Sequence, residues 1–435
     1  FLDEFAAAQP DPAPAPQELV AAAPVVGPTI GPVDWCKGDP GPSCRLSLGW
    51  SDARPAPVVA VLLPGWRRKG RWTWDDNQIA AARIDPGRGG PMTLEVLVAA
   101  ELHSRYDGFL VLTVHPRLPV PDMKVRILDK PQGTRLFLKP AGAPDDKARA
   151  AVAAWLGRQH DVAIDSGCIE LGPAWSSAAA SGPAAEAVLA LASCQYPPGL
   201  FDRAVAERSY ARLADRVAQL PIAERPQALF LVGDQVYVDD TAGLFVPTSG
   251  SDVHRAYRLN FELEARRRLT KAVPTFPLLD DHEVIDNWEP SPAGTAEPGF
   301  VSTALDAYRQ YQHDLVQPGA EPPFDYVTNA GGLPAFVLDV RGARQPRTVR
   351  GVAGTADVEQ ALIHPDSDFA ALRSWLQSKK ALGCPLLVVT SVALFPFSRA
   401  ALAGRGDRIG LDDWGGYPRS ALALLRVLVE EQAER

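Results

Sequence analysis

Short apolar runs separated by turn-forming residues dominate the chain between Val33 and about Lys139. Each run has the length of a single strand, and clusters of Gly, Pro and Asp divide one run from the next. The spacing therefore predicts a smaller, β-rich domain over residues 33–144. The runs lie at 58–63, 94–100, 109–114, 124–128 and 135–138.

From residue 186 onwards, continuous apolar runs alternate with stretches in which apolar residues recur every three or four positions. The first pattern is typical of buried strands and the second of amphipathic helices. Strands are predicted at 187–193, 228–232, 274–279, 335–340 and 386–390, and helices at 201–220, 252–271, around 305–315 and around 421–428. Regular alternation of this kind predicts an α/β domain over residues 186–435.

The remaining segments have the composition of connectors. Residues 1–32 are rich in Ala and Pro, which predicts an extended arm. Residues 145–185 predict a helix at 145–159 followed by a linker, because Ser, Ala, Gly and Pro crowd its second half.

Composition excludes several classes of function. A net charge of -8 over 435 residues does not attract nucleic acid, so we expect no specific nucleic-acid binding. We also expect no transmembrane segment, because no apolar run approaches the roughly 18 residues that a span requires. The 5 Cys are too few for a disulfide scaffold, and none of the 7 His follows His364.

Three predicted strands end in residues that can bind metals. The first ends at Ser193-Cys194-Gln195, the second at Gly233-Asp234 with Tyr237 three residues on, and the third at Asp280-Asp281-His282-Glu283. In open α/β sheets, ligands bind beyond the carboxyl ends of the strands. Asp binds hard cations, and Tyr does so when the metal is acidic enough to remove its proton, as ferric iron is.

Each motif also has a simpler interpretation. Asp234 can cap a helix after its turn, and Cys194 can be a small core residue. The third motif is the most specific, because crowding two Asp, a His and a Glu after an apolar strand is costly without a cation or a chemical role. One carboxylate can bind a metal there while the neighbouring imidazole donates a proton.

These residues resemble the alkaline phosphatase D (PhoD-like) family of the metallophosphoesterase superfamily. The resemblance rests on Ala192-Ser193-Cys194-Gln195, Gly233-Asp234-x-x-Tyr237, and Asp280 to Glu283 followed by Asn287-Trp288. Later segments agree in order, namely Asp306 to Tyr311, Leu338-Asp339-Val340-Arg341 and Asp413 to Pro418. The resemblance covers about 187–431. It implies an αββα-sandwich, here preceded by the β-rich domain, for which we expect an Ig-like fold.

The resemblance implies metal-dependent hydrolysis of phosphate mono- or diesters by a metal-activated hydroxide, at a centre of Fe³⁺ and Ca²⁺ or other divalent metals. The iron ligands would be Cys194, Asp234 and Tyr237, with Asp281 at a further ligand position. His282 would be the general acid. Asn287 and Arg341 would bind substrate, although a structural role is equally open for each. The resemblance also implies a periplasmic or secreted protein, and cytoplasmic residence stays open.

One departure from the family pattern keeps other hypotheses open. The family closes its site with a strand ending in Gly-Asp-x-His after the helix near 420–431, and that motif is missing from this sequence. We therefore expect the domain to lack its last strand and to associate with a separate C-terminal segment. A non-catalytic, phosphatase-like binding or structural module is the main alternative. A hydrolase that uses Cys194 and His282 is a third.

Overall fold

The structure is a computed structural model of the chain. It describes residues between 26 and 433, with gaps. None of the helices in it combines the length and apolarity of a membrane span. The described ranges are 26–36, 43–51, 58–68, 71–75, 80–84, 92–99, 106–114, 134–138, 154, 164–170, 187–198, 203–221, 224–239, 250–290, 298–317, 319–348, 356–357, 360–394 and 412–433.

Two sheets form the amino-terminal part, as the short apolar runs predict. One has the order β1-β2-β6-β8, with β6 and β8 parallel and the other pairs antiparallel. The other sheet has the order β4-β3-β7-β9, with β5 also paired to β3. Their bounds are β1 Val26–Cys36, β2 Ser43–Ser51, β3 Val58–Arg68, β4 Arg71–Trp74, β5 Ala80–Ile84, β6 Met92–Ala99, β7 Gly108–Val114, β8 Thr134–Leu138 and β9 Ile164–Glu170.

One of these strands begins before the bounds predicted for the β-rich domain, and another lies beyond them. Strand β1 begins at Val26, within the predicted arm, and β9 lies in the predicted connector at 145–185. Strand β9 has a weak apolar pattern of its own, and its backbone pairs with β7 along its whole length. The helix predicted at 145–159 lies outside the described residues except for Ala154, as does the run at 124–128. The domain boundaries and the Ig-like fold stay predictions.

The second part contains two three-stranded sheets. Strands β10 (Leu189–Ala192), β11 (Ala228–Val232) and β12 (Thr275–Leu278) run parallel to one another. Strands β13 (Tyr326–Ala330) and β14 (Leu333–Val337) form a hairpin, and β17 (Leu387–Val389) pairs in parallel with β14. Strands β15 (Arg347–Thr348) and β16 (Ala356–Asp357) form a separate short pair.

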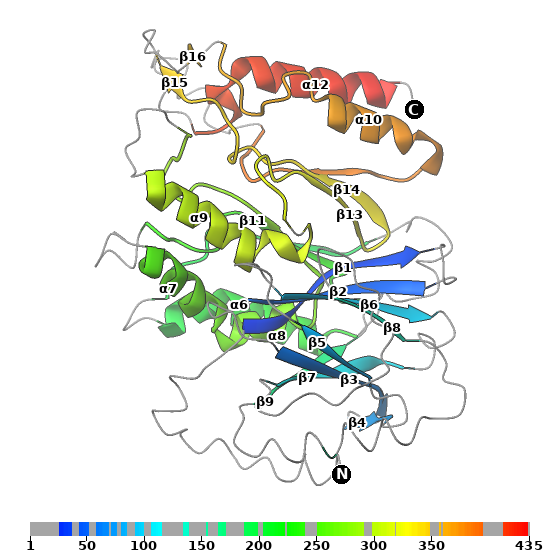
Figure 1. Ribbon diagram of the computed structural model, residues 1–435. Helices are drawn as coiled ribbons and strands as arrows, with labels where there is room; N and C mark the ends of the chain where they lie inside the picture. The colour runs from blue at the N-terminus through cyan, green and yellow to red at the C-terminus, as the bar shows by residue number, and fades with distance from the viewer. Residues whose placement is uncertain are drawn as a thin grey trace.

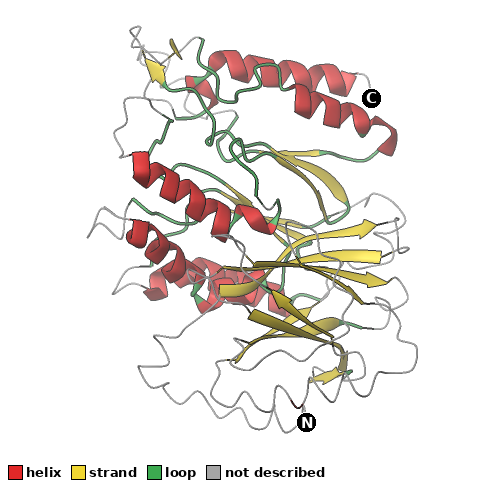
Figure 2. Cartoon of the chain, in the orientation of Figure 1, coloured by secondary structure: helices red, strands yellow, loops and turns green. Residues whose placement is uncertain are grey.

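The two sheets pack face to face and carry helices on their outer faces (Figures 1 and 2). Phe230 and Phe276 of the first sheet meet Tyr326 and Val337 of the second in one buried cluster. Helices α6 (Arg203–Gln219) and α8 (Glu264–Thr270) pack on the first sheet. Helices α10 (Ala370–Ser378) and α12 (Pro418–Ala433) pack on the second. The predicted α/β class is confirmed, with the layers in the order helix, sheet, sheet, helix.

The helix predicted at 252–271 is two helices, α7 (Gly250–Phe261) and α8. The break is at Leu263, whose backbone is extended with φ -58° and ψ 122°. Tyr257 and Phe261 of α7 pack against α9 (Pro298–Tyr311) in one core, whereas Leu263 and Leu269 pack against α6 in another. Because the two halves face different cores, one straight helix cannot bury both.

The amino-terminal part packs directly against the α/β part. Strand β1 contacts β12, β13 and the 3₁₀ turn η4 (His313–Leu315) that follows α9. Gly31 in β1 lies so close to Leu315 that a Cβ atom built on it would be 3.0 Å from the Leu315 Cγ atom. The first of the two amino-terminal sheets therefore borders the layers that carry the site.

Candidate metal centre

The site lies where the three parallel strands of the first sheet end. The backbone N–H of Cys194, after β10, donates to the Gly233 carbonyl at 3.4 Å, and that of Gln195 donates to Asp234 at 2.8 Å. Strand β12 leads into Asp280 and Asp281 beside them. The parallel register thus brings the three predicted motifs to one edge of the sheet.

The side chains of that edge form a compact group of donors. Asp234, Asp281 and His282 each offer a ligand atom, and these atoms lie within 4.8 Å of one another. The Cys194 Sγ and the Tyr237 hydroxyl each lie 3.4 Å from Asp234 Oδ2, to which both donate. All five residues predicted as metal ligands or as the acid are therefore gathered in one place.

The protonation chemistry of this group suits a cation. Burial, followed by the charge of Asp281, raises the pKa of Asp234. Burial is also the largest cause of the raised pKa of Tyr237, followed by the charge of Asp234. Cys194 is exposed, but its thiol loses part of its hydration to the neighbouring groups, which raises its pKa as well. Each side chain would bind a cation best as an anion, and positive charge is what would lower these pKa values.

Two backbone features set the positions of Cys194 and Asp234. Both residues have left-handed backbones, with φ values of 53° and 54°, and Gly233 between the strand and Asp234 has φ 88°. A Cβ atom on Gly233 would lie 2.3 Å from the Asp280 Cβ atom. Glycine is therefore required here both for its backbone conformation and for the close approach of the two strand ends.

His282 is held by a carboxylate that the sequence analysis does not identify. Its Nδ1 lies 2.9 Å from Asp239 Oδ2, and its Nε2 lies 3.7 Å from Asp286 Oδ1. Burial lowers the pKa of His282, but the hydrogen bond and charge of Asp239 outweigh it and raise the pKa to about 9. The ring stacks on Tyr237 at 4.1 Å between centroids. A single Asp in the turn after β11 carries no sequence signal that distinguishes it from an ordinary turn residue.

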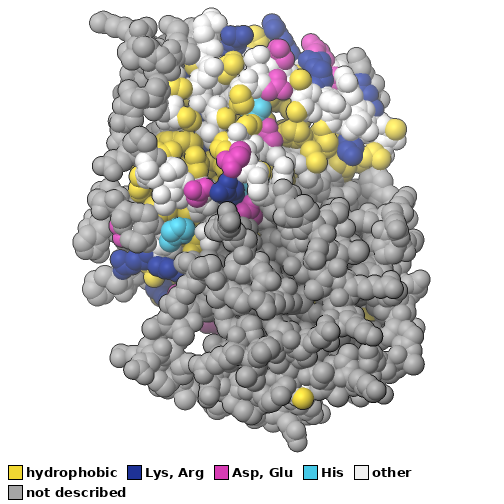
Figure 3. All heavy atoms as spheres, in the orientation of Figure 1, with side chains coloured by type: hydrophobic (Ala, Val, Ile, Leu, Met, Phe, Trp, Pro, Cys, Tyr) yellow, Lys and Arg dark blue, Asp and Glu magenta, His cyan; other side chains and the backbone are white. Residues whose placement is uncertain are grey.

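Arg341, predicted to bind substrate, is buried against carboxylates. Its side chain is 1% exposed and is paired with Asp280, with Asp281 at 3.4 Å and with Asp412. Burial raises the pKa of Asp280 to about 6 despite this guanidinium. Figure 3 shows a separate gathering of acidic and basic side chains at the surface, between α9 and the layer of α10 and α12, whereas the Arg341 side chain is enclosed in the interior. The structure therefore places Arg341 among the carboxylates that surround the site.

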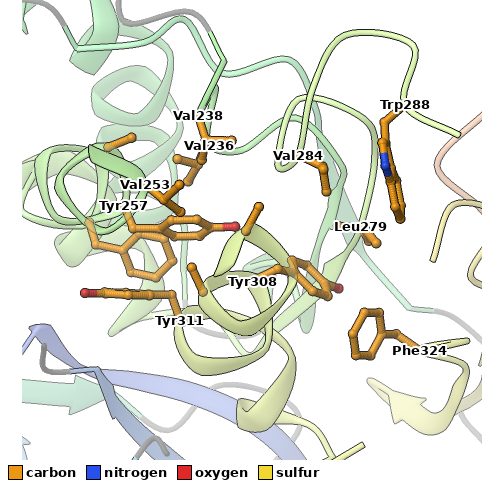
Figure 4. Packing of buried hydrophobic residues seen from close by; sticks show 14 residues of the cluster. Val236, Val238, Val253, Tyr257, Leu279, Val284, Trp288, Tyr308, Tyr311 and Phe324 are labelled. Carbon is orange, nitrogen blue, oxygen red and sulfur yellow. The ribbon is translucent and has the colours of Figure 1, made fainter. Parts of the chain in front are cut away.

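Asn287, the other residue predicted to bind substrate, is exposed. Its backbone is left-handed, with φ 54°, and its N–H donates to Asp281 Oδ2 at 2.6 Å. Its neighbour Trp288 is buried together with Val284 in an aromatic cluster that includes Tyr308 (Figure 4). The packing of Val284 and Trp288 anchors the turn after β12, which holds the Asn287 backbone N–H against Asp281 and leaves the Asn287 side chain exposed.

Glu283 is the remaining acid of the third motif, and it faces away from solvent. It is fully buried and accepts the backbone N–H groups of Asp234, Gln235 and Asp280. Burial, followed by the charge of Asp234, raises the pKa of Glu283 to about 8, while the hydrogen bonds from the Gln235 and Asp280 backbones act in the opposite direction and favour the carboxylate. Adjacency in the sequence does not separate this buried acceptor from Asp281, whose carboxylate belongs to the donor group.

Together, the layers and the strand-end acids define an α/β protein with two packed sheets and a candidate cation site at the carboxyl ends of parallel strands. Among solved structures, the chain is similar to one titled "Structure of PhoD", with a TM-score of 0.51 and 13% sequence identity. The similarity covers 93% of this chain and 69% of that one. The resemblance to PhoD is thus confirmed at the level of the fold. No family model matches the sequence, and no curated protein does.

Proposed function

We propose that this protein is a metal-dependent hydrolase of phosphate mono- or diesters, with His282 as general acid. The observation that carries the proposal is the group of Asp234, Asp281 and His282, whose ligand atoms lie within 4.8 Å of one another at strand ends. The fold shared with PhoD supports the phosphate-ester class. The sequence resemblance supports the same class through the motifs that carry these residues.

Asp234 and Asp281 would hold the cation, with Cys194 and Tyr237 beside Asp234 as further ligands. Fe³⁺ and Ca²⁺ are the metals that the resemblance favours, and the mixed set of carboxylate, phenol and thiol is compatible with other divalent metals. When bound, the metal would supply positive charge that lowers the pKa of a water molecule and offsets charge on the phosphoryl oxygens.

His282 would protonate the oxygen of the leaving group. Asp239 occupies Nδ1 at 2.9 Å, so Nε2 is the nitrogen from which a proton is transferred. The carboxylate fixes the orientation of the ring and stabilises its cationic form. Asn287, exposed beside Asp281, would contact the substrate, and Arg341 would act by holding Asp280 and Asp281 in place.

The test measures bound metal and hydrolysis of 4-nitrophenyl phosphate and bis(4-nitrophenyl) phosphate by the whole chain. We expect Asp234→Asn to lose both metal and activity, and His282→Ala to lose activity while it retains metal. A protein without bound metal, and without activity sensitive to His282→Ala, contradicts the proposal and favours a non-catalytic module. Alkylation of Cys194 that abolishes activity and leaves the metal in place would favour the Cys-His hydrolase.

A further inference from the structure

Glu283 accepts three backbone N–H groups, and the side-chain amide of Gln312 also donates to its Oε1 at 3.5 Å. The Glu283 side chain is 0% exposed, so it has no access to substrate. We propose that Glu283 is a positioning residue that holds the ends of β11 and β12 at the spacing a cation requires. The inference rests on the proposed function, because it assumes that Asp234 and Asp281 bind a metal.

The three bonds join two different strand ends. Glu283 Oε2 accepts the N–H of Asp234 at 3.0 Å and that of Asp280 at 3.1 Å. Glu283 Oε1 accepts the N–H of Gln235 at 2.7 Å. Asp234 and Gln235 follow β11, whereas Asp280 follows β12. A single carboxylate thus ties together the two loops that carry Asp234 and Asp281.

The backbone that Glu283 holds is one that needs support. Asp234 has φ 54°, a conformation that residues other than glycine rarely adopt, and such residues persist where their surroundings fix them. Gln235 is fixed a second time, because its Nε2 donates to the Gly233 carbonyl at 2.8 Å. The Tyr210 hydroxyl of α6 donates to Gln235 Oε1 at 2.7 Å. Glu283 and α6 therefore hold the turn after β11 from two sides.

The turn after β12 explains how Glu283 reaches this position. The N–H groups of Val284 and Ile285 both donate to the Asp281 carbonyl at 2.7 Å, which closes a tight turn. The turn displays Asp281 and His282 at the site and returns Glu283 to the strand ends behind it. Any shift of Glu283 would therefore move the Asp234 backbone and the Asp281 turn relative to each other.

Replacing the Glu283 carboxylate by an amide of the same size distinguishes a role in hydrogen bonding from a role in packing alone. In Glu283→Gln, one oxygen remains as an acceptor, while the NH₂ group faces a backbone N–H that also donates. The size of the side chain is unchanged, but at least one of the three bonds is lost. Asp314→Asn is a matched control, because Asp314 is also buried and accepts one backbone N–H, that of Gly319 at 2.6 Å, away from the site.

The experiment titrates the metal-free whole chain with Mn²⁺, a cation that carboxylates bind, and measures free Mn²⁺ by electron paramagnetic resonance. Amide hydrogen exchange of peptides that contain Asp234, Gln235 and Asp280 is measured in the metal-free protein. For Glu283→Gln we expect Mn²⁺ affinity at least tenfold weaker and faster exchange in these peptides. Asp314→Asn should leave both quantities at the wild-type level.

A Glu283→Gln protein that binds Mn²⁺ within twofold of the wild type overturns the inference. If Glu283→Gln does not fold, Glu283→Asp replaces it, since Asp keeps two acceptor oxygens at a shorter reach. Intermediate affinity then supports the inference and wild-type affinity overturns it. Asp234→Asn, titrated in parallel, separates the two proposals. If the wild type does not bind Mn²⁺, or Asp234→Asn binds it equally well, the proposed metal site itself fails.

Discussion

At the scale of single residues, partners distant in the sequence decide what a side chain can do. His282 has one carboxylate at each ring nitrogen, but Asp239 lies 2.9 Å from Nδ1 and is largely buried, whereas Asp286 lies 3.7 Å from Nε2 and is 65% exposed. The shorter, less hydrated contact is the one that orients the ring.

We expect Asp239→Asn to lower kcat by about 100-fold, because the amide accepts a hydrogen bond from Nδ1 but does not stabilise the imidazolium. Asp286→Asn, which changes the exposed carboxylate near the same ring, should leave kcat within threefold of the wild type. The check is steady-state hydrolysis of aryl phosphates with leaving groups of different pKa. The loss should shrink as the phenol becomes more acidic, and a loss that is equal for all leaving groups would contradict an effect on general acid catalysis.

A second residue-scale prediction concerns His313, which is fully buried with no hydrogen-bond partner for either ring nitrogen among the described residues. Burial, aided by the charge of Arg309, lowers its pKa to about 4. The unfolded state then binds more protons between pH 6.5 and 4, so stability falls as the pH falls through this window. We expect the His313 contribution to decrease by about 2 kcal/mol between pH 7.5 and 5, and His313→Phe to remove that decrease.

Urea unfolding at the two pH values tests this, and His364→Gln provides the contrast. Burial lowers the pKa of His364, but a hydrogen bond to Asp325 at 2.8 Å outweighs it and raises the pKa. The contribution of His364 to the free energy of unfolding is fully present below pH 6.5 and is lost as the pH rises through the raised pKa of the folded state. His364→Gln should therefore cost more stability at pH 5 than at pH 7.5, in the opposite sense to His313→Phe.

The candidate site could be predicted to the extent that it follows strand ends. Cys194, Asp234 and Asp281 lie at the carboxyl ends of apolar runs, and parallel strands bring such ends together. Asp239 and Glu283 could not be assigned in this way, because their roles come from contacts with residues more than 40 positions away. Local patterns contain no information about such pairs.

At the scale of elements, periodicity located most helices and strands, and it failed where packing overrides it. Strands β10, β11, β12, β14 and β17 were predicted from their apolar runs, whereas the short pair of β15 and β16 was not. The hairpin strand β13, with Thr328 and Asn329 in its middle, also has no such run. It forms because β14 supplies its backbone partners across a tight turn at Gly331 and Gly332. Helix α10 was also not predicted.

Gly233 shows how strongly one element end depends on a single residue. Gly233→Ala adds a Cβ 2.3 Å from Asp280 to a backbone with φ 88°. We expect a loss of at least about 2 kcal/mol in the free energy of unfolding, together with loss of Mn²⁺ binding. Gly383→Ala is the matched control, because Gly383 has φ 60° and open space around its Cβ position. It should cost only about 1 kcal/mol and leave Mn²⁺ affinity unchanged.

Chemical denaturation and Mn²⁺ titration of both variants provide the measurement. Equal losses for the two substitutions would show that backbone conformation alone accounts for Gly233. The close approach of β11 and β12 would then make no separate contribution to the free energy of unfolding.

At the scale of the whole molecule, β1 connects the amino-terminal sheets to the layers that carry the site. Gly31 and Leu315 meet at this junction, where a Cβ atom would be 3.0 Å from Leu315 Cγ and 3.0 Å from its carbonyl oxygen. Sequence patterns predicted both parts but not this contact. The sequence around Gly31 and around Leu315 contains no pattern that indicates a contact between the two residues.

We expect Gly31→Ala to destabilise the protein by about 1 kcal/mol through overpacking. Leu315→Ala removes part of the obstruction, so the double variant should be more stable than the sum of the two single effects implies. A double-mutant cycle from urea unfolding measures the coupling. If the two changes in unfolding free energy are strictly additive, residues 31 and 315 are not in steric conflict in the Gly31→Ala protein.

Arg341 has a consequence for how variants of this protein are interpreted. Arg341 follows β14 of one sheet and pairs with Asp280 and Asp281, which follow β12 of the other sheet. Its ion pairs therefore join the two sheets as well as bordering the site. Truncating Arg341 leaves buried carboxylates unpaired, and inactivity would then reveal nothing about contact with phosphate. Natural variation is expected to be permitted at exposed Asn287 long before it is permitted at Arg341. If the proposed function holds, substrate preference would therefore change through Asn287 rather than through Arg341.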